Sequence, residues 1–140
     1  MNYTVKLTRW DKDQENLSQV RRSVFIGEQQ VPEELEWDEF DNISIHVLVT
    51  DKNNQTIATG RMKPDGHIGR MAVSKNYRKT GIGSAILKAL IKEAINRHLN
   101  SVYLHAQTTA IPFYEKHGFK ISSEEFMDAG IPHKSMTLDL

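Results

Sequence analysis

A basic turn followed by two glycines is the first place where residue types and spacing in this sequence suggest chemistry. The turn lies between an apolar segment and a helical pattern, and reads Arg78, Lys79, Thr80, Gly81, Ile82, Gly83 and Ser84. The first turn of a helix has amide N–H groups without intrahelical partners and carries partial positive charge, so it binds anions. Glycine lets a phosphate approach the backbone closely. The pattern therefore predicts a phosphate site.

Two common phosphate-binding motifs do not fit these letters. A P-loop places its lysine after the last glycine, whereas Arg78 and Lys79 precede both glycines. A dinucleotide fingerprint needs Gly or Ala at its third glycine position, where this chain has Ile86. An ordinary glycine-containing turn from strand to helix remains the alternative interpretation.

A second feature is a run of acidic residues between Glu28 and Asp41 that contains no lysine or arginine. Such a run is usually a solvated face. The alternative is an acidic wall that attracts a cationic acceptor such as an amine. The members of the run are Glu28, Glu33, Glu34, Glu36, Asp38, Glu39 and Asp41.

Composition excludes several classes of function. The 140 residues, 39% hydrophobic and 26% charged, fit a single domain spanning 1–140. Because the formal net charge is zero, nucleic acid is not expected as a main partner. The absence of cysteine removes disulfides, Cys-ligated zinc and a cysteinyl acyl-enzyme. No apolar run approaches 18 residues and no leader pattern opens the chain, so we expect no membrane segment and a cytoplasmic location.

The first half of the chain must supply strands and one helix to position the turn. Residues 3–8 alternate as in a half-buried strand, and Asp11 or Asp13 can cap a helix that ends near Gly27. A loop with a second short helix over 33–40 should follow Pro32. Apolar patterns at 45–49, 56–62 and 67–73, with a tight turn at Asp65-Gly66, predict three consecutive antiparallel strands.

The second half predicts a parallel crossover. The helix after the glycines should bury a stripe made by Ile82, Ala85, Ile86, Ala89, Leu90 and Ile95. A strand over 102–106 then completes a strand, helix and strand unit, which binds ligands at the carboxyl ends of its strands. A short helix over 109–117 and closing strands over 119–126 and 133–138 follow. The predicted fold class is α/β, a mixed sheet with helices on both faces.

A second segment has to be considered together with the phosphate turn: A-I-P-F-Y-E-K-H-G-F, from Ala110 to Phe119. Together the two segments resemble the GNAT superfamily of acyl-CoA-dependent N-acetyltransferases, with signatures [QR]-x-x-G-x-[GA] and A-x-x-F-Y-x-x-x-G-F. The alternative interpretation of the second segment is a core aromatic pair with a glycine stop. The resemblance extends to 24–34 and 130–133, which are similar to a small single-domain bacterial branch of that superfamily.

The resemblance implies where acyl-CoA would bind. Backbone groups of Met71, Ala72 and Val73 would hold the pantetheine arm where two parallel strands splay apart. The turn from Arg78 to Ser84 would hold the pyrophosphate, and Gln107 and Phe113 would lie along the other side of the pantetheine. The hydroxyl of Tyr114 would lie near the CoA sulfur. Acetyl-CoA is then the expected co-substrate.

Acetyl transfer to an amine needs a base, an oxyanion site and an acid for the leaving thiolate. With no cysteine, direct attack in a ternary complex is the simplest route, with backbone N–H near Ala72 or Val73 polarising the thioester. Tyr114 is the candidate acid, since tyrosine has a reference pKa of about 10 and is protonated at neutral pH. Three residues are candidate bases, each with a structural alternative: Glu28 as a solvated helix end, His105 as a core histidine and His133 as a turn residue.

The resulting hypothesis is an N-acetyltransferase that moves an acetyl group to the primary amine of a small molecule, or of an aminoacyl or peptide acceptor. A protein N-terminus or lysine is also open as acceptor, and the protein would be a monomer or homodimer. The alternative from another class is a non-catalytic acyl-CoA-binding sensor or regulatory module. No metal is predicted, because His46, His67, His98 and His117 lack metal-ligand spacing.

Overall fold

The N-terminal part of the chain folds into an antiparallel sheet of four strands in the order β1-β2-β3-β4. The structure is a computed structural model that describes residues 2–140, with the side chains of residues 34 and 35 outside the description. The strands are β1 (Tyr3–Arg9), β2 (Ile45–Asp51), β3 (Thr56–Met62) and β4 (Ile68–Val73). The three predicted consecutive antiparallel strands are thus confirmed as β2, β3 and β4.

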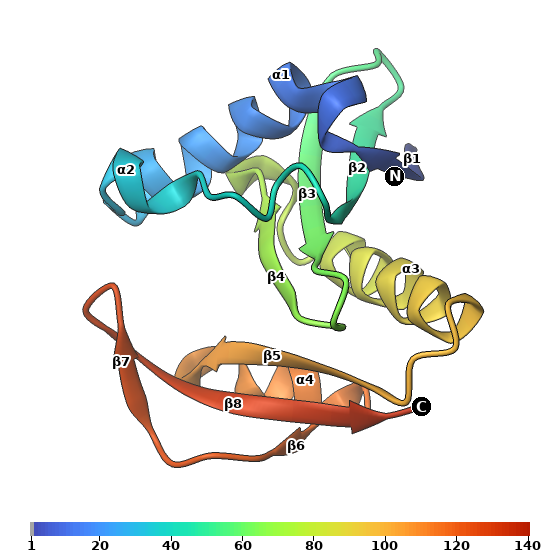
Figure 1. Cartoon of the computed structure of the whole chain (residues 1–140). Helices are drawn as coiled ribbons and strands as arrows, with labels where there is room; N and C mark the ends of the chain where they lie inside the picture. Colours follow the sequence, from blue (N-terminus) through green and yellow to red (C-terminus); the bar gives the residue numbers. More distant parts are fainter. Residues whose placement is uncertain (1) are drawn as a thin grey trace.

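The C-terminal part forms a second sheet in the order β5-β8-β6, with β7 also paired to β8. Its strands are β5 (Ser101–Gln107), β6 (Lys120–Ile121), β7 (Phe126–Asp128) and β8 (Ile131–Asp139). One parallel bridge, between His67 and Tyr103, joins the two sheets, and the Tyr103 amide donates to the Gly66 carbonyl at 3.1 Å. Beyond this bridge β4 and β5 diverge, as Figure 1 shows.

Helices cover both faces of the first sheet (Figure 1). On one face lie α1 (Trp10–Arg21) and the π-helix η1 (Arg22–Glu28), which bury Leu17, Val20 and Val24. On the other lies α3 (Ile82–Asn96), whose apolar residues share a core cluster with β2, β3 and β5. The shorter helices are α2 (Glu33–Glu36), η2 (Lys75–Tyr77), η3 (Thr108–Ala110) and α4 (Ile111–Lys116). The mixed α/β architecture is as predicted.

Several local predictions are wrong. Neither Asp11 nor Asp13 caps α1: Arg9 is its N-cap, and Asp13 lies inside the helix at a kink, where it accepts the Thr8 hydroxyl at 2.5 Å. Ile95 is 54% exposed, because it lies about 100° around α3 from the buried Ala94. Leu87 is buried in that stripe and was not predicted.

The predicted strand over 119–126 is also wrong in extent. It is two short strands, β6 and β7, separated by residues 122–125. The Ser123 hydroxyl accepts from the Ser135 amide at 2.8 Å, and this side-chain contact takes the place of a backbone ladder bond. β7 joins β8 through a turn in which Ala129 and Gly130 have positive φ, so the two strands form a hairpin beside β5.

A bulge in β4 decides which way two of its side chains point. Thr59 pairs with Ala72 and Arg61 with Gly69, so Arg70 and Met71 together oppose the single residue Gly60. Arg70 adopts φ 48°, a left-handed conformation uncommon for a residue with a side chain. The bulge lets both Arg70 and Met71 line the space that opens between β4 and β5.

Candidate active site

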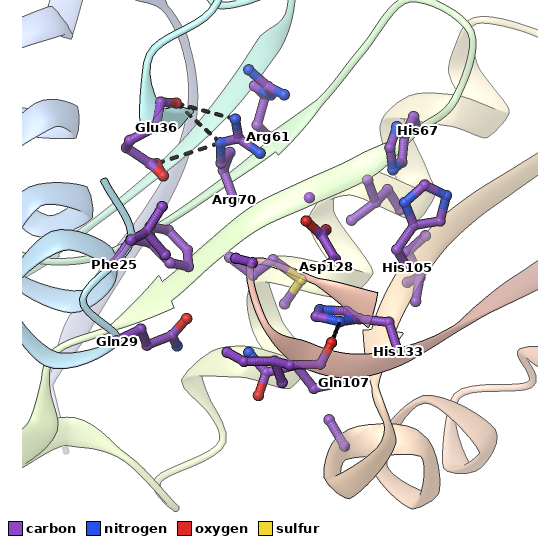
Figure 2. A pocket seen from close by; sticks show the side chains of 18 of the residues that line it. Phe25, Gln29, Glu36, Arg61, His67, Arg70, His105, Gln107, Asp128 and His133 are labelled. Atoms are coloured by element: carbon purple, nitrogen blue, oxygen red, sulfur yellow. Dashed lines mark hydrogen bonds and ion pairs between the residues drawn. The ribbon is translucent and has the colours of Figure 1, made fainter. Parts of the chain in front are cut away.

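A cavity of ≈ 340 Å³ lies where β4 and β5 diverge. Its volume is at the small end of the range for ligand sites. Five predicted site residues line it: Met71, His105, Gln107, Tyr114 and His133. Figure 2 shows that the labelled side chains come from η1 and the residue after it, α2, β3, β4 and the residue before it, β5, and the β7–β8 hairpin. The topology therefore gathers residues from most of the chain length around one space.

The predicted phosphate turn has the backbone that its glycines suggest. Gly81 is left-handed, with φ 85°, and caps α3; Lys79 has φ 62°. A Cβ added to Gly83 would lie 3.6 Å from the Phe113 ring, an ordinary van der Waals distance, so the turn lies beside α4. The turn therefore presents the unpaired first-turn amides of α3 beside the exposed Lys79.

The Arg78 side chain turns away from those amides. Its Nε donates to the Val73 carbonyl at 2.9 Å, and its Nη2 pairs with Glu28 at 2.9 Å. Glu28 is thus held by an ion pair on the outside of the turn, and it is not part of the cavity lining. Of the three candidate bases, the fold brings His105 and His133 to the cavity and leaves Glu28 beside the turn.

Other residues of the turn are also anchored. The Thr80 hydroxyl donates to the Tyr77 carbonyl, and the Ser84 hydroxyl lies 2.9 Å from Nε2 of His117. Ile82 is buried in the core below, and Ala72 is buried against Val20 and Val24.

Tyr114 lies at the end of the cavity nearest to α4. Its hydroxyl is 4.0 Å from the Met71 sulfur, and its ring contacts those of Phe113 and Phe119 edge to face. Burial raises the pKa of Tyr114 above its usual value. A raised pKa keeps the phenol protonated, which suits a proton donor.

Three histidines, His67, His105 and His133, also line the cavity (Figure 2). The ring centroid of His67 is 4.7 Å from that of His105, and Phe126 lies between His105 and His133. Burial lowers the pKa of His67 to about 4, with smaller effects from His105 and Lys63, and burial also lowers the pKa of His105. His67 is therefore neutral at neutral pH.

The hydrogen bond of His133 fixes its tautomer. Nδ1 lies 2.7 Å from the Ile131 carbonyl, which can only accept, so Nδ1 carries the proton. In the neutral ring the lone pair is then on Nε2. His133 is 8% exposed and lines the cavity, so its imidazole is held in one orientation. This is the arrangement that a general base requires.

A closed ring of six ion-pair contacts borders the cavity, and four of its members, Glu36, Asp38, Arg61 and Arg70, line it. Each carboxylate is shared by two guanidiniums, in the cyclic order Arg21, Glu36, Arg70, Asp38, Arg61 and Asp41, with N–O distances of 2.7 to 3.4 Å. The guanidinium carbon of Arg21 also lies 5.2 Å from the ring centroid of Trp10 and 5.0 Å from that of Trp37. Figure 2 shows the contacts between Glu36 and Arg70.

The ion-pair ring is buried except along one edge. Arg70 and Asp38 are 28% and 26% exposed at their side chains, whereas the other members are 3% exposed or less. Burial raises the pKa of Glu36 against the opposing effect of Arg21. For Asp38, hydrogen bonding and charge from Arg61 outweigh burial, and its pKa is lowered.

The acidic run fits the solvated-face interpretation only in part: Glu28, Glu33 and Glu39 are exposed. Glu36 and Asp41 are buried, so the solvated-face interpretation is wrong for them. They are neutralised by arginines, so they form no bare acidic wall. Glu33 makes an exposed pair with Arg22, and the side chain of Glu34 lies outside the described residues.

Sequence reasoning missed Arg61, Arg70, Lys63, His67 and Asp128 as cavity residues. A signal was present for the two arginines: each interrupts an otherwise apolar strand, Arg61 before Met62 and Arg70 before Met71. A charged residue inside a buried strand needs a partner. The acidic run, which contains no cation of its own, supplies those partners.

Among the described residues, no group of three or more histidine or acidic side chains is placed to hold a metal ion. No helix between residues 2 and 140 is long and apolar enough to cross a membrane.

Comparison with protein families identifies the class to which this fold and cavity belong. The sequence model of the family described as "Acetyltransferase (GNAT) domain" matches residues 11–140. The chain therefore belongs to the GNAT acetyltransferase family, and it is an acyltransferase whose fold uses acyl-CoA as co-substrate.

Particular relatives cover most of this chain. It is 45% identical over 124 residues to the uncharacterized N-acetyltransferase YjcF of Bacillus subtilis (strain 168), covering 86% of this chain and 88% of that protein. Protein ElaA of Escherichia coli is 30% identical, with 89% of this chain and 86% of that protein covered. The crystal structure of an acyl-CoA N-acyltransferase from Pseudomonas aeruginosa matches with a TM-score of 0.87 and 26% identity, covering 98% of this chain and 99% of that one.

Proposed function

We propose that this protein transfers an acetyl group from acetyl-CoA to a primary amine of a small molecule, or of an aminoacyl or peptide acceptor, by direct attack in a ternary complex. The observation that carries the proposal is the cavity between β4 and β5, which is lined by Tyr114, Met71, His105 and His133. Its small volume favours a small acceptor, or the end of a larger one.

In this proposal acetyl-CoA enters at the divergence of the two strands. The α3 amides and Lys79 hold the pyrophosphate, with Arg78 to Ser84 as the turn. The backbone of Met71, Ala72 and Val73 lies along the pantetheine, opposite Gln107 and Phe113. This places the thioester near the Met71 sulfur and the Tyr114 hydroxyl, which lie 4.0 Å apart.

The chemical steps are assigned to three groups. Nε2 of His133 removes a proton from the acceptor ammonium or from the attacking amine, and His105 is the competing candidate. Backbone N–H near Ala72 or Val73 stabilises the oxyanion of the tetrahedral intermediate. Tyr114 then gives its proton to the departing thiolate. Glu28 is left out, because its carboxylate pairs with Arg78 outside the cavity lining.

The proposal treats residues 1–140 as one N-acetyltransferase domain, acting as a monomer or homodimer in the cytoplasm, with acyl-CoA and an amine as its partners. The match of the family model to residues 11–140 supports the domain assignment.

The test is thiol release from acetyl-CoA across a broad panel of amines, with His133→Gln as the inactive comparison. The proposal expects amine-dependent CoA release that the variant lowers by about 10² to 10⁴. If acetyl-CoA binds but no member of the panel stimulates release, a binding module is favoured over the enzyme proposed.

A further inference from the structure

The exposed edge of the ion-pair ring lies in the acceptor part of the cavity. Arg61, Lys63, Arg70 and Asp38 line the cavity together with the histidines. In contrast, the predicted acetyl-CoA groups cluster around Tyr114 and the turn before α3. The edge of the ring is therefore placed to contact the acceptor and not the co-substrate.

The carboxylates of the ring have little capacity left for a ligand. Asp38 accepts from Arg61, Arg70 and the Phe40 amide. Asp41 accepts from Arg21 and Arg61 through one oxygen, and from the Asp38 amide through the other. A cationic group would have to compete with two guanidiniums for each of these carboxylates.

The Arg61 guanidinium supplies a surplus donor. A guanidinium carries five N–H donors, and the acceptors of the ring are shared: the Glu36 carbonyl accepts from Arg21 and Arg70, and backbone amides take lone pairs of Asp38 and Asp41. Arg61 is 3% exposed and donates through Nη1 to both Asp38 and Asp41. Within the described residues its buried Nε has no hydrogen-bond partner.

A further cation adds to this surplus. Lys63 lines the cavity with its ammonium 4.0 Å from the Phe40 ring centroid. Burial lowers the pKa of Arg70; Glu36 and Asp38 oppose that shift, whereas Arg61 and Arg21 add to it. The acids at the cavity are Glu36 and Asp38, both held in the ring, and Asp128 on the exposed β7–β8 turn.

We infer that the acceptor carries an anionic oxygen group, a carboxylate, in addition to its amine, and that Arg70, Arg61 and Lys63 recognise that group. This inference rests on the proposed function, since it names the acceptor class of the same site. It differs from an amine attracted by an acidic wall, because the acids that the sequence suggested are already paired. The amine would face His133 while the carboxylate faces Arg70 and Lys63.

The experiment compares matched acceptors with purified protein and saturating acetyl-CoA. Glycine, β-alanine and γ-aminobutyrate are each tested beside the corresponding carboxamide and aminoalkylphosphonate, so that both the spacing and the anion vary. A charge-assisted hydrogen bond should favour at least one carboxylate over its amide by about tenfold or more in kcat/KM. A phosphonate that exceeds its carboxylate would overturn the carboxylate in favour of a phosphate-type anion.

Variants test whether Arg70 and Lys63 recognise the carboxylate. Arg70→Gln should bring the ratio of carboxylate to amide close to one, and Lys63→Met, which removes no ring member, should lower it in part. Arg97→Gln is the matched control, since it removes a guanidinium from an exposed pair with Glu93 on α3 and should leave the ratio unchanged. Equal kcat/KM for carboxylates and amides in the wild-type protein would refute the inference, even if Arg70→Gln fails to fold.

A binding measurement separates this inference from the proposed function. Calorimetric titration of acetyl-CoA into the protein reports on the co-substrate site alone. If no acceptor is turned over, the same amino acids and carboxamides are titrated into the protein–CoA complex. Binding of the carboxylates but not the amides supports the inference without turnover, and absence of binding by every carboxylate refutes it while acetyl-CoA binding stands.

Discussion

Replacing Tyr114 with Phe separates chemistry from packing at the end of the cavity. The ring contacts of Tyr114 with Phe113 and Phe119 do not involve the hydroxyl and should persist. Among the described residues, the contact of the Tyr114 hydroxyl is its 4.0 Å approach to the Met71 sulfur, a weak acceptor. We therefore expect the free energy of unfolding to change by less than about 1 kcal/mol.

The effect on rate should be much larger. Because burial keeps the Tyr114 phenol protonated, its loss removes the proposed donor to the leaving thiolate. General acid catalysis contributes about 10² to 10⁴ in rate, and a water molecule can recover part of it. We expect kcat to fall by roughly 10²-fold, with a smaller change in the KM for acetyl-CoA.

The assay is single-turnover thiol release, combined with calorimetric titration of CoA and thermal unfolding. Tyr103→Phe is the matched control: it removes the same atom from a tyrosine whose hydroxyl donates to Asp65 at 2.5 Å, outside the cavity lining. A Tyr114→Phe variant that keeps kcat within about twofold, when chemistry limits the rate, would show that Tyr114 is not the acid. A loss confined to CoA affinity would mean that it only packs.

Three further predictions concern the histidines and the ion-pair ring. Glu36→Gln should lower the free energy of unfolding by about 3 kcal/mol, because Arg21 is left buried with one carboxylate; denaturant titration checks this, with the exposed Glu33→Gln as a nearly silent control. His67 has a folded pKa of about 4 against about 6.5 when unfolded, so the unfolded state binds more protons between these values. Stability should fall by about 2 kcal/mol from pH 7 to pH 5, and His67→Gln should flatten that dependence. His133→Gln should lower kcat more than His105→Gln does in the same steady-state assay; the reverse order would move the base to His105.

Local motifs account for the part of the site that the sequence predicted. Each of these motifs is a contiguous segment: the turn from Arg78 to Ser84 and the helix that contains Tyr114. The local sequence therefore determines the local conformation. Gly81 needs positive φ, and the structure has 85° there. The strands that flank them, β4 and β5, follow from apolar patterns that agree with the tertiary structure.

The ion-pair ring could not be predicted in the same way, because it joins residues that are distant along the chain. Arg21 comes from α1, Glu36 from α2, Arg61 from β3 and Arg70 from a bulge in β4. Nothing local to Arg70 specifies its positive φ, which depends on the register of β4 against β3. The acidic run was visible, but whether it faced solvent or arginine depended on that register.

The measurement that tests the central claim most directly is calorimetric titration of CoA into Gly83→Val. The Cβ position at Gly83 is free of clashes, with Phe113 at 3.6 Å, and valine is no worse than glycine in a helix, so the variant should fold. Its methyl groups would stand where the pyrophosphate must approach the α3 amides. The account predicts that CoA affinity falls by about tenfold or more, while Gly27→Ala, a glycine change outside the turn, keeps it. Unchanged CoA affinity in a folded Gly83→Val protein would contradict the assignment of this turn as the pyrophosphate site.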